Sequence, residues 1–197
     1  MKFVFLLDPL VAIGSLPLYA KIITTLQSHF DKVSARLNPP DQIRVAFIPA
    51  TPTPTPFDLL IYFVPTELSI VSRFAGRPRN PLLDDGDGFT SIKTVTSNGV
   101  TRTSAASEVY TKTLNPEVLA ALAFHEGMHN RLAIGQALHS RSGMAHAVVD
   151  PSTTVTDENA IQMAAAFNTP VTQWPDGVVT LVNHRVRRDT GDPLWYL

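Results

Sequence analysis

Residues 115–132 read NPEVLAALAFHEGMHNRL, and this stretch predicts the best-marked helix of the chain. Asn115 is a good N-cap, and Pro116 suits the first helical position because proline has no backbone N–H group to leave unpaired. Glu117 complements the positive N-terminal end of the helix dipole. Alanine and leucine dominate residues 118–124, so we expect the helix to run to about residue 131.

The rest of the chain alternates between helical and strand patterns. Apolar residues recur every three or four positions over 18–37, which predicts a long N-terminal helix. Alternating apolar and polar residues over 43–48 and a continuous apolar run over 58–64 predict two strands. A further C-terminal helix is expected over 157–167, where Thr156 precedes the first turn as an N-cap.

A β-hairpin is predicted immediately before the motif helix. Residues 91–96 and 107–112 are plausible strands, and Asn98-Gly99 between them is the typical signal of a tight hairpin turn. If the strand over 107–112 forms the upper edge of a cleft, an extended peptide can pair with it through backbone hydrogen bonds.

The composition describes a globular chain with few residue types that could hold a metal. The chain has 197 residues, of which 44% are apolar and 17% charged, and this length favours a single domain over residues 1–197. The formal net charge of −1 argues against nucleic-acid binding, because nucleic-acid binders carry a basic excess. There is no cysteine, so any metal must be held by His, Asp or Glu.

The N-terminal residues 1–20 look superficially like a secretory signal but lack its parts. The apolar run Phe3–Leu7 is short, and Asp8 and Pro9 interrupt it. We therefore expect an uncleaved, folded N-terminus. No stretch reaches the roughly 20 apolar residues that cross a bilayer, so we expect no membrane span. The sequence leaves the location open, and a soluble protein that is secreted or delivered as an effector is compatible with it.

Residues 125–129 read His-Glu-Gly-Met-His within the predicted helix. Side chains four residues apart share a helix face, so His125 and His129 can present ring nitrogens to one metal ion. Glu126 lies about 100° further round the helix, where its carboxylate can reach a metal-bound water without displacing a ligand. A zinc ion activates such a water, and the carboxylate moves its proton. The spacing therefore predicts a catalytic Zn2+ site.

A third protein ligand is expected, because catalytic zinc sites hold three side chains and a water molecule. His139 is the first candidate, since Gly135 can take the positive φ that leads the chain out of the helix and back to the metal. Glu158 is the rival, although an acid in the first turn of a helix is also expected for the dipole alone. The other candidates are His146, Asp157 and Asp150.

The motif over 125–129 resembles that of the zincin metallopeptidases. It looks closest to the metzincin pattern H-E-x-x-H-x-x-G-x-x-H, in which three histidines hold the zinc ion. Here Gly135 follows His129 by six residues instead of three, and His139 follows Gly135 by four, so the loop is longer. The stretch 125–145 also looks similar to small bacterial peptidase-like domains carried by secretion-system effectors.

We therefore expect an α+β, zincin-like fold with a long N-terminal helix, a small mixed β-sheet, the motif helix beneath it and a further C-terminal helix. The resemblance implies a zinc-dependent metallopeptidase in which His125, His129 and His139 hold Zn2+ and Glu126 is the general base. Its partner would be a peptide or protein substrate and no nucleic acid. An inhibitor or a delivery partner is left open.

Three alternatives remain. A gluzincin-like site would take Glu158 as its third ligand. A zinc amidase would keep the metal but act on peptidoglycan or another non-protein amide. A non-catalytic binding or structural protein would use zinc only to stabilise its fold.

Overall fold

The computed structural model describes residues 1–8, 13–48, 53–65 and 87–173. Along these residues the elements are β1 (Lys2–Leu7), α1 (Leu16–Ser34), β2 (Ile43–Ile48), β3 (Leu59–Val64), β4 (Gly88–Ser97), β5 (Val100–Tyr110), α3 (Pro116–Leu132), the 3-10 helices η2 (Gln136–Ser140) and η3 (Gly143–Ala145), α4 (Asp157–Ala166) and β6 (Thr172–Gln173).

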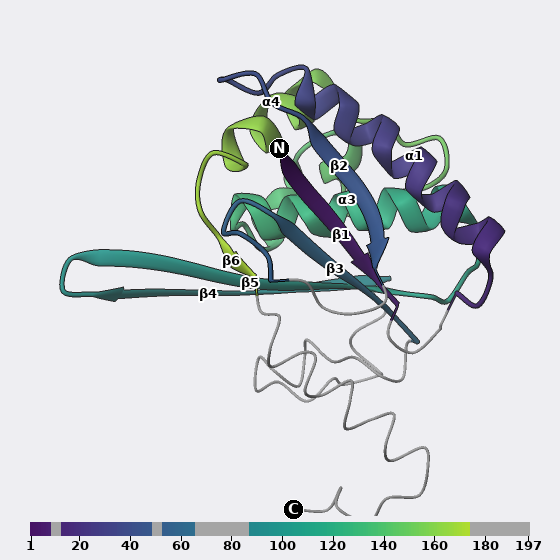
Figure 1. Ribbon diagram of the computed structural model, residues 1–197, viewed down its shortest axis with the longest axis horizontal. Coiled ribbons are helices and arrows are strands. Elements are labelled where there is room, and N and C mark those ends of the chain that lie inside the picture. Colours follow the sequence, from purple (N-terminus) through teal and green to yellow (C-terminus); the bar gives the residue numbers. More distant parts are fainter. Residues whose placement is uncertain (9–12, 49–52, 66–86, 174–197) are drawn as a thin grey trace, which may run out of the picture.

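One sheet organises the described residues (Figure 1). Its strand order is β2-β1-β3-β5-β4, and β6 pairs with β5 beside Ser104 and Ala105. The neighbours β2–β1, β1–β3 and β3–β5 are parallel, whereas β4 and β5 form an antiparallel hairpin. β3 is the uninterrupted apolar run because it lies between two parallel neighbours, and all of its six residues are buried.

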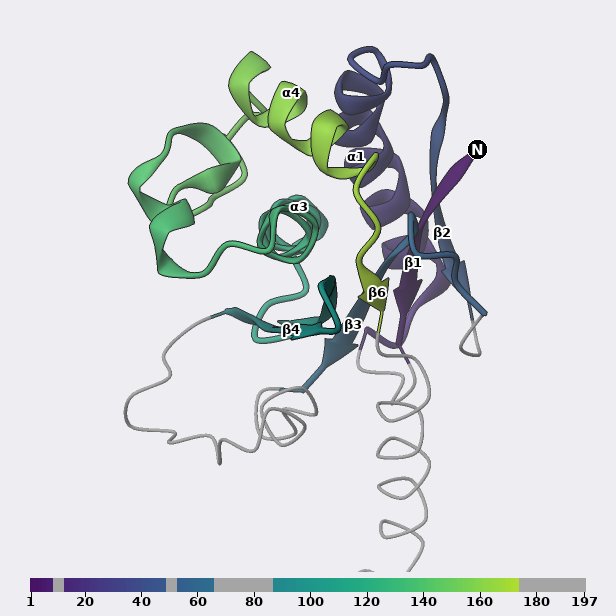
Figure 2. The same cartoon turned by 90° about the vertical axis from the view of Figure 1, so that its left-hand side faces the viewer.

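The helices α1 and α3 pack on one face of this sheet, and α4 lies on the helices (Figure 2). α1 and α3 lie side by side, and α4 packs against both. Aromatic rings join the three helices, since Phe30 of α1 lies 5.0 Å from Phe124 of α3 and 6.0 Å from Phe167, which follows α4. Each fully buried ring contributes about 1.5–3 kcal/mol to this core. None of the described helices is both long and apolar enough to cross a membrane.

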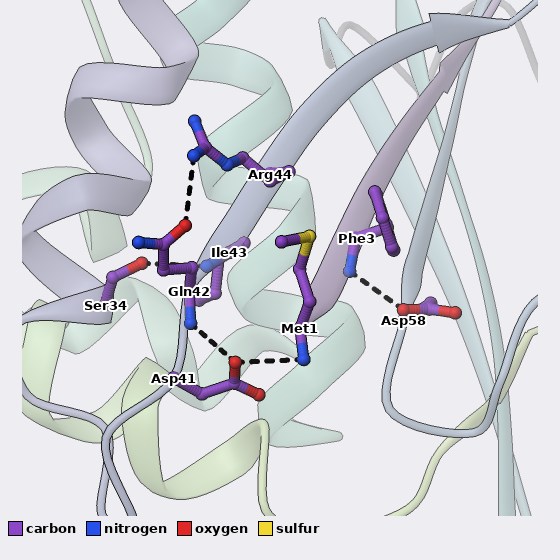
Figure 3. A network of polar contacts seen from close by, with 8 residues as sticks. All are labelled: Met1, Phe3, Ser34, Asp41, Gln42, Ile43, Arg44 and Asp58. Carbon is purple, nitrogen blue, oxygen red and sulfur yellow. Dashed lines mark hydrogen bonds and ion pairs between the residues drawn. The ribbon is translucent and has the colours of Figure 1, made fainter.

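The N-terminal strand β1 lies inside the sheet, between β2 and β3. Polar contacts fix its start (Figure 3): the Met1 backbone nitrogen lies 2.9 Å from the carboxylate of Asp41, and the Phe3 N–H group donates to Asp58 at 2.8 Å. Of residues 1–20, Lys2–Leu7 therefore act as a packing strand of the core.

The expected α+β, zincin-like arrangement is only partly correct. A mixed sheet, an N-terminal helix, a motif helix and a later helix are all present, but the sheet is mostly parallel and the fold is mixed α/β. The helix layout also differs, because α1 and α3 share one face of the sheet as neighbours. The physical reason is that α1 is the crossover between the parallel strands β1 and β2, and apolar patterns do not show which strands pair or in which direction.

The predicted β-hairpin is present and is longer than expected. Asn98 and Gly99 both have left-handed backbone conformations, with φ of 52° and 75°, which match the right-handed twist of the flanking strands. The strands extend over Gly88–Ser97 and Val100–Tyr110 instead of 91–96 and 107–112. The hairpin projects well beyond the rest of the sheet (Figure 1).

His29 of α1 predicts an acid-sensitive contribution to stability. Its ring stands edge-on to Phe124 at 5.8 Å, and burial together with the charge of Lys32 lowers the pKa of His29 to about 4. The neutral ring is favoured in the folded state, so this contribution is complete above pH 6.5 and is lost as the pH falls from 6.5 toward 4. Because the ring is partly exposed, we expect an effect of about 1–2 kcal/mol.

Urea unfolding of the wild type and of His29→Gln at pH 7.5 and 5.0 measures this contribution. The wild type should lose about 1–2 kcal/mol more than the variant between the two pH values. Equal losses in the two proteins would contradict the prediction.

Candidate metal centre

The helix that carries the motif begins at Pro116 and ends at Leu132, close to the predicted bounds, but it leaves the helical conformation through another residue than expected. The Asn115 side chain accepts hydrogen bonds from the backbone N–H groups of Glu117 and Val118, at 3.0 and 3.1 Å. At the other end the left-handed residue is Ala133, with φ 52°, whereas Gly135 has φ −80°. The expectation that Gly135 supplies the positive φ is therefore wrong. The chain leaves the helix two residues earlier, which lengthens the loop before η2.

Three histidines meet at the end of this helix. His125 and His129 come from successive turns of α3, and η2 brings His139 to them. Their Nε2 atoms lie 3.1 Å apart for His125 and His129, 3.2 Å for His125 and His139, and 3.0 Å for His129 and His139. His125 and His129 are buried, and His139 is half-buried.

The opposite ring nitrogens are held by backbone carbonyls. His125 Nδ1–H donates to the carbonyl of Met144 at 2.8 Å, and His129 Nδ1–H donates to that of Ile134 at 2.7 Å. With Nδ1 protonated, the neutral ring carries its lone pair on Nε2. Burial lowers the pKa of all three histidines, that of His125 to about 4. They are therefore neutral near pH 7, which is the form that binds metals.

This geometry fits a small divalent ion. A tetrahedral ion with metal–nitrogen bonds of about 2.0–2.1 Å keeps its ligand nitrogens about 3.3 Å apart, close to the spacing of the three Nε2 atoms. Among the described residues, no carboxylate or further histidine joins this group. Three imidazoles would therefore hold the ion and leave a fourth position for water or substrate.

The rival ligands lie elsewhere. They are Glu158, Asp157, Asp150 and His146, and the group of three histidines contains none of them. Glu158 accepts a hydrogen bond from Gln162 one helical turn later, at 2.8 Å. Asp157 pairs with Arg36 at 2.9 Å. The Asp150 carboxylate accepts a hydrogen bond from the backbone N–H group of Ser152. The ring of the exposed His146 accepts one from the backbone N–H group of Val148. Asp157 and Glu158 lie in the first turn of α4, whose N-cap is Thr156.

Glu126 is buried between α3 and β4. Its Oε2 accepts a hydrogen bond of 2.6 Å from the hydroxyl of Thr90, which also lies 2.8 Å from the Ser107 hydroxyl. Burial, and to a smaller extent the nearby carboxylate of Glu108, raises the pKa of Glu126 to about 8, and the hydrogen bond from Thr90 opposes this shift. The carboxylate is thus held on the sheet side of the motif helix.

Gly88 and Thr90 are parts of the site that the sequence did not indicate. Both lie on the face of β4 that meets α3, since residues two apart on a strand share a face. A Cβ atom at Gly88 would lie 2.5 Å from Oε1 of Glu126 and 2.7 Å from its Cγ. The glycine therefore makes room for the carboxylate. Residues 88, 90 and 92 point to one face of the strand. This alternation would have indicated Gly88 and Thr90, had the position of the hairpin against α3 been known.

Gly88→Ala should displace the Glu126 carboxylate while leaving the three histidines in place. We expect a loss of at least about 10-fold in any activity that uses Glu126, at unchanged metal content, because a positioned acid–base group contributes about 10²–10⁴-fold. Overpacking should also lower the free energy of unfolding by about 1–3 kcal/mol. Gly135→Ala is the control, since a Cβ there meets nothing within 4 Å. Full activity of Gly88→Ala would contradict this role.

Asn130, directly after the second histidine, ties the motif helix to the sheet. It is fully buried, and its amide donates to the Ser107 hydroxyl at 3.0 Å and to the Gln173 side chain at 3.1 Å. Gln173 donates back to Asn130 at 2.9 Å and accepts from the Leu60 N–H group at 3.1 Å. One polar network thus joins α3 to β3, β5 and β6.

Arg131 ties the same helix to the segments around it. It is 2% exposed, and its guanidinium donates to four backbone carbonyls, those of Pro56, Asp58, Ala166 and Thr169, at 2.6–3.2 Å. The Cζ atom of its guanidinium also lies 4.9 Å from the centroid of the Phe167 ring. Burial lowers the pKa of Arg131 to about 10, so it remains charged at neutral pH.

Comparisons with known proteins add no assignment to this geometry. The chain matches no model of a known protein family, and it has no significant match among curated proteins or solved structures.

Proposed function

We propose that this protein is a zinc-dependent metallopeptidase. The observation that carries the proposal is the convergence of three Nε2 atoms, 3.0–3.2 Å apart, on rings that include His125, which directly precedes the buried Glu126 on the same helix. Three imidazoles and no thiolate suit zinc.

Each residue of the site has a role in this proposal. His125, His129 and His139 would hold the ion, and the carbonyls of Met144 and Ile134 orient two of these rings. When bound, zinc supplies Lewis acidity and lowers the pKa of a coordinated water.

Glu126 would accept the proton of the attacking water and deliver it to the leaving amine. Thr90 donates to one of its oxygens and so fixes the direction in which the carboxylate points.

The edge of the sheet favours a peptide over other amides. Among the described residues β4, not β5, is the outer strand, so the condition that the strand over 107–112 forms the edge is not met. β4 carries Thr90, which contacts Glu126, and an outer strand offers unpaired backbone groups to an extended chain. An extended peptide on this edge would pass close to the site.

Zinc stoichiometry tests the ligand set. We expect about one zinc ion per chain in the wild type, a loss of at least about 100-fold in zinc affinity in His139→Ala, and unchanged binding in Glu158→Ala. Elemental analysis after dialysis against a zinc buffer measures this. Loss in Glu158→Ala alone would favour a gluzincin-like site, and no zinc in the wild type would refute the metal centre.

Hydrolysis assays then test the activity. The zinc-loaded protein should cleave members of a mixed panel of unfolded proteins, and chelation should stop cleavage. Digestion of cell walls without cleavage of any protein would favour the peptidoglycan amidase. Bound zinc without either activity would favour a non-catalytic protein stabilised by the ion.

A further inference from the structure

The outer half of the hairpin, residues 93–104, forms a two-stranded ribbon that projects beyond the helices (Figure 1). Most of its side chains are exposed, including Val95 at 49% and Val100 at 55%. A two-stranded hairpin alone is marginally stable in water, so an exposed ribbon of this length is a surface suited to a partner.

The two faces of the ribbon differ in chemistry. On the face that continues from Thr90, threonine hydroxyls pair across the strands: Thr94 with Thr103 at 3.2 Å, and Thr96 with Thr101 at 3.0 Å. The opposite face carries two cations, because Lys93 pairs with Ser104 and Arg102 pairs with Val95. Lys93 and Arg102 are therefore diagonal neighbours on one face.

This cation pair is not neutralised within the hairpin. Residues 88–107 contain no Asp or Glu, and in the described part of the chain neither Lys93 nor Arg102 forms an ion pair. Both side chains are exposed. Like charges repel, and an anion bound between Lys93 and Arg102 would remove this repulsion.

Among the described residues, no strand pairs with the outer edge of the ribbon. The close hydroxyl pairs identify Thr94–Thr103 and Thr96–Thr101 as non-hydrogen-bonded pairs, in which the backbone N–H and C=O groups point away from the partner strand. On β4, the outer strand, these groups of Thr94 and Thr96 face outward. Their alternating donors and acceptors match an added polypeptide strand.

We propose that this ribbon binds an extended polypeptide segment that carries acidic side chains at alternate positions. The segment adds to the β4 edge, and its carboxylates lie on the face of Lys93 and Arg102. β4 runs from the ribbon to Thr90 beside Glu126, so, resting on the proposed function, the segment belongs to the substrate and its acidic part precedes or follows the cleaved bond.

Charge and backbone chemistry favour an acidic polypeptide segment over a second copy of the ribbon and over a nucleic acid. A second copy of the ribbon would bring four cations together with no acid between them, which disfavours a ribbon-to-ribbon dimer. A nucleic acid offers phosphates to Lys93 and Arg102, but it cannot pair with the alternating N–H and C=O groups of a strand edge.

Binding is tested separately from hydrolysis, with the full-length Glu126→Gln variant and a fluorescently labelled 12-residue peptide of alternating Glu and Thr. We expect saturable anisotropy that weakens with salt, and no binding of the matching Lys–Thr peptide. Lys93→Glu with Arg102→Glu should lower the affinity at least about 10-fold. Lys21→Glu with Arg44→Glu changes the net charge equally on other exposed positions and should leave it within about twofold.

The remaining outcomes separate this inference from the proposed function. Equal weakening by both double variants, equal binding of the Lys–Thr peptide, or tighter binding of oligo-dT would overturn the acidic-segment site. Loss of dimers in the Lys93 and Arg102 variant by sedimentation would assign the ribbon to self-association instead. Binding of the Glu–Thr peptide without hydrolysis of any substrate by the wild type would keep the site and refute the peptidase. Cleavage of peptides without this binding would do the reverse.

Discussion

Glu126→Gln should lower the rate of peptide hydrolysis by about 10²–10⁴-fold without loss of bound zinc. Glutamine has nearly the same shape, and its amide oxygen can still accept the hydrogen bond from Thr90. It cannot accept the proton of the attacking water at any accessible pH. The loss should therefore fall on kcat rather than on KM, since the ion and the substrate edge are unchanged.

Glu117→Gln is the matched control for this variant. Glu117 lies in the exposed first turn of the same helix, so its replacement changes the charge of α3 equally without touching the site. Steady-state kinetics and zinc content of the three proteins are measured together. Full activity of Glu126→Gln with zinc bound would remove Glu126 from the mechanism, and loss of zinc in this variant would show that the carboxylate supports the metal instead.

Arg131→Met should lower the free energy of unfolding by about 3–5 kcal/mol. The substitution keeps an apolar stem against Phe167 but removes the donor to four carbonyls, two of them in buried hydrogen bonds, that belong to the segment before β3 and to the end of α4 and the residues after it. Unfolding in urea of the metal-free proteins measures the change. With an m value of about 2 kcal/mol/M, the midpoint should fall by about 2 M.

Arg36→Met gives the contrast for this measurement. Arg36 also pairs with a partner far away in the sequence, Asp157, but both side chains are largely exposed, at 48% and 83%. We expect its loss to change stability by less than about 1 kcal/mol. Equal effects of the two substitutions would mean that the carbonyls around Arg131 find water or other donors once the guanidinium is gone.

The elements that depend on local sequence were predicted well. The start of α3 follows from Asn115 and Pro116, and the hairpin turn follows from Asn98-Gly99, because caps and tight turns are decided by neighbouring residues. The end of the helix was predicted to within one residue, but the residue with the positive φ was not, since Ala133 takes a left-handed conformation that its side chain does not favour. The interactions of the loop impose this conformation, and no local pattern marks it.

In the candidate site, too, the features that depend on local sequence were predicted and those that depend on tertiary packing were not. The spacing of His125 and His129 indicated a shared ligand face, and His139 was the first of several candidates for the third position. The carbonyls that orient the rings could not be found from the sequence, because every residue carries one. Thr90 and Gly88 could not be found either, since their role depends on how β4 registers against α3. Parallel pairing of the strands is likewise decided by tertiary packing.

The three histidines are close neighbours along the chain as well as in space. His129 and His139 are 10 residues apart, and His125 and His139 are 14 apart. Loop-closure entropy rises with the logarithm of loop length, so bringing these rings together restricts little of the chain. Glu126, by contrast, meets Thr90 from 36 residues away. On the proposed function, the ion can therefore be captured by a short segment before the sheet is complete, whereas Glu126 acquires its surroundings only when the hairpin docks. The same proposal predicts that a partly unfolded chain retains zinc after it has lost hydrolysis.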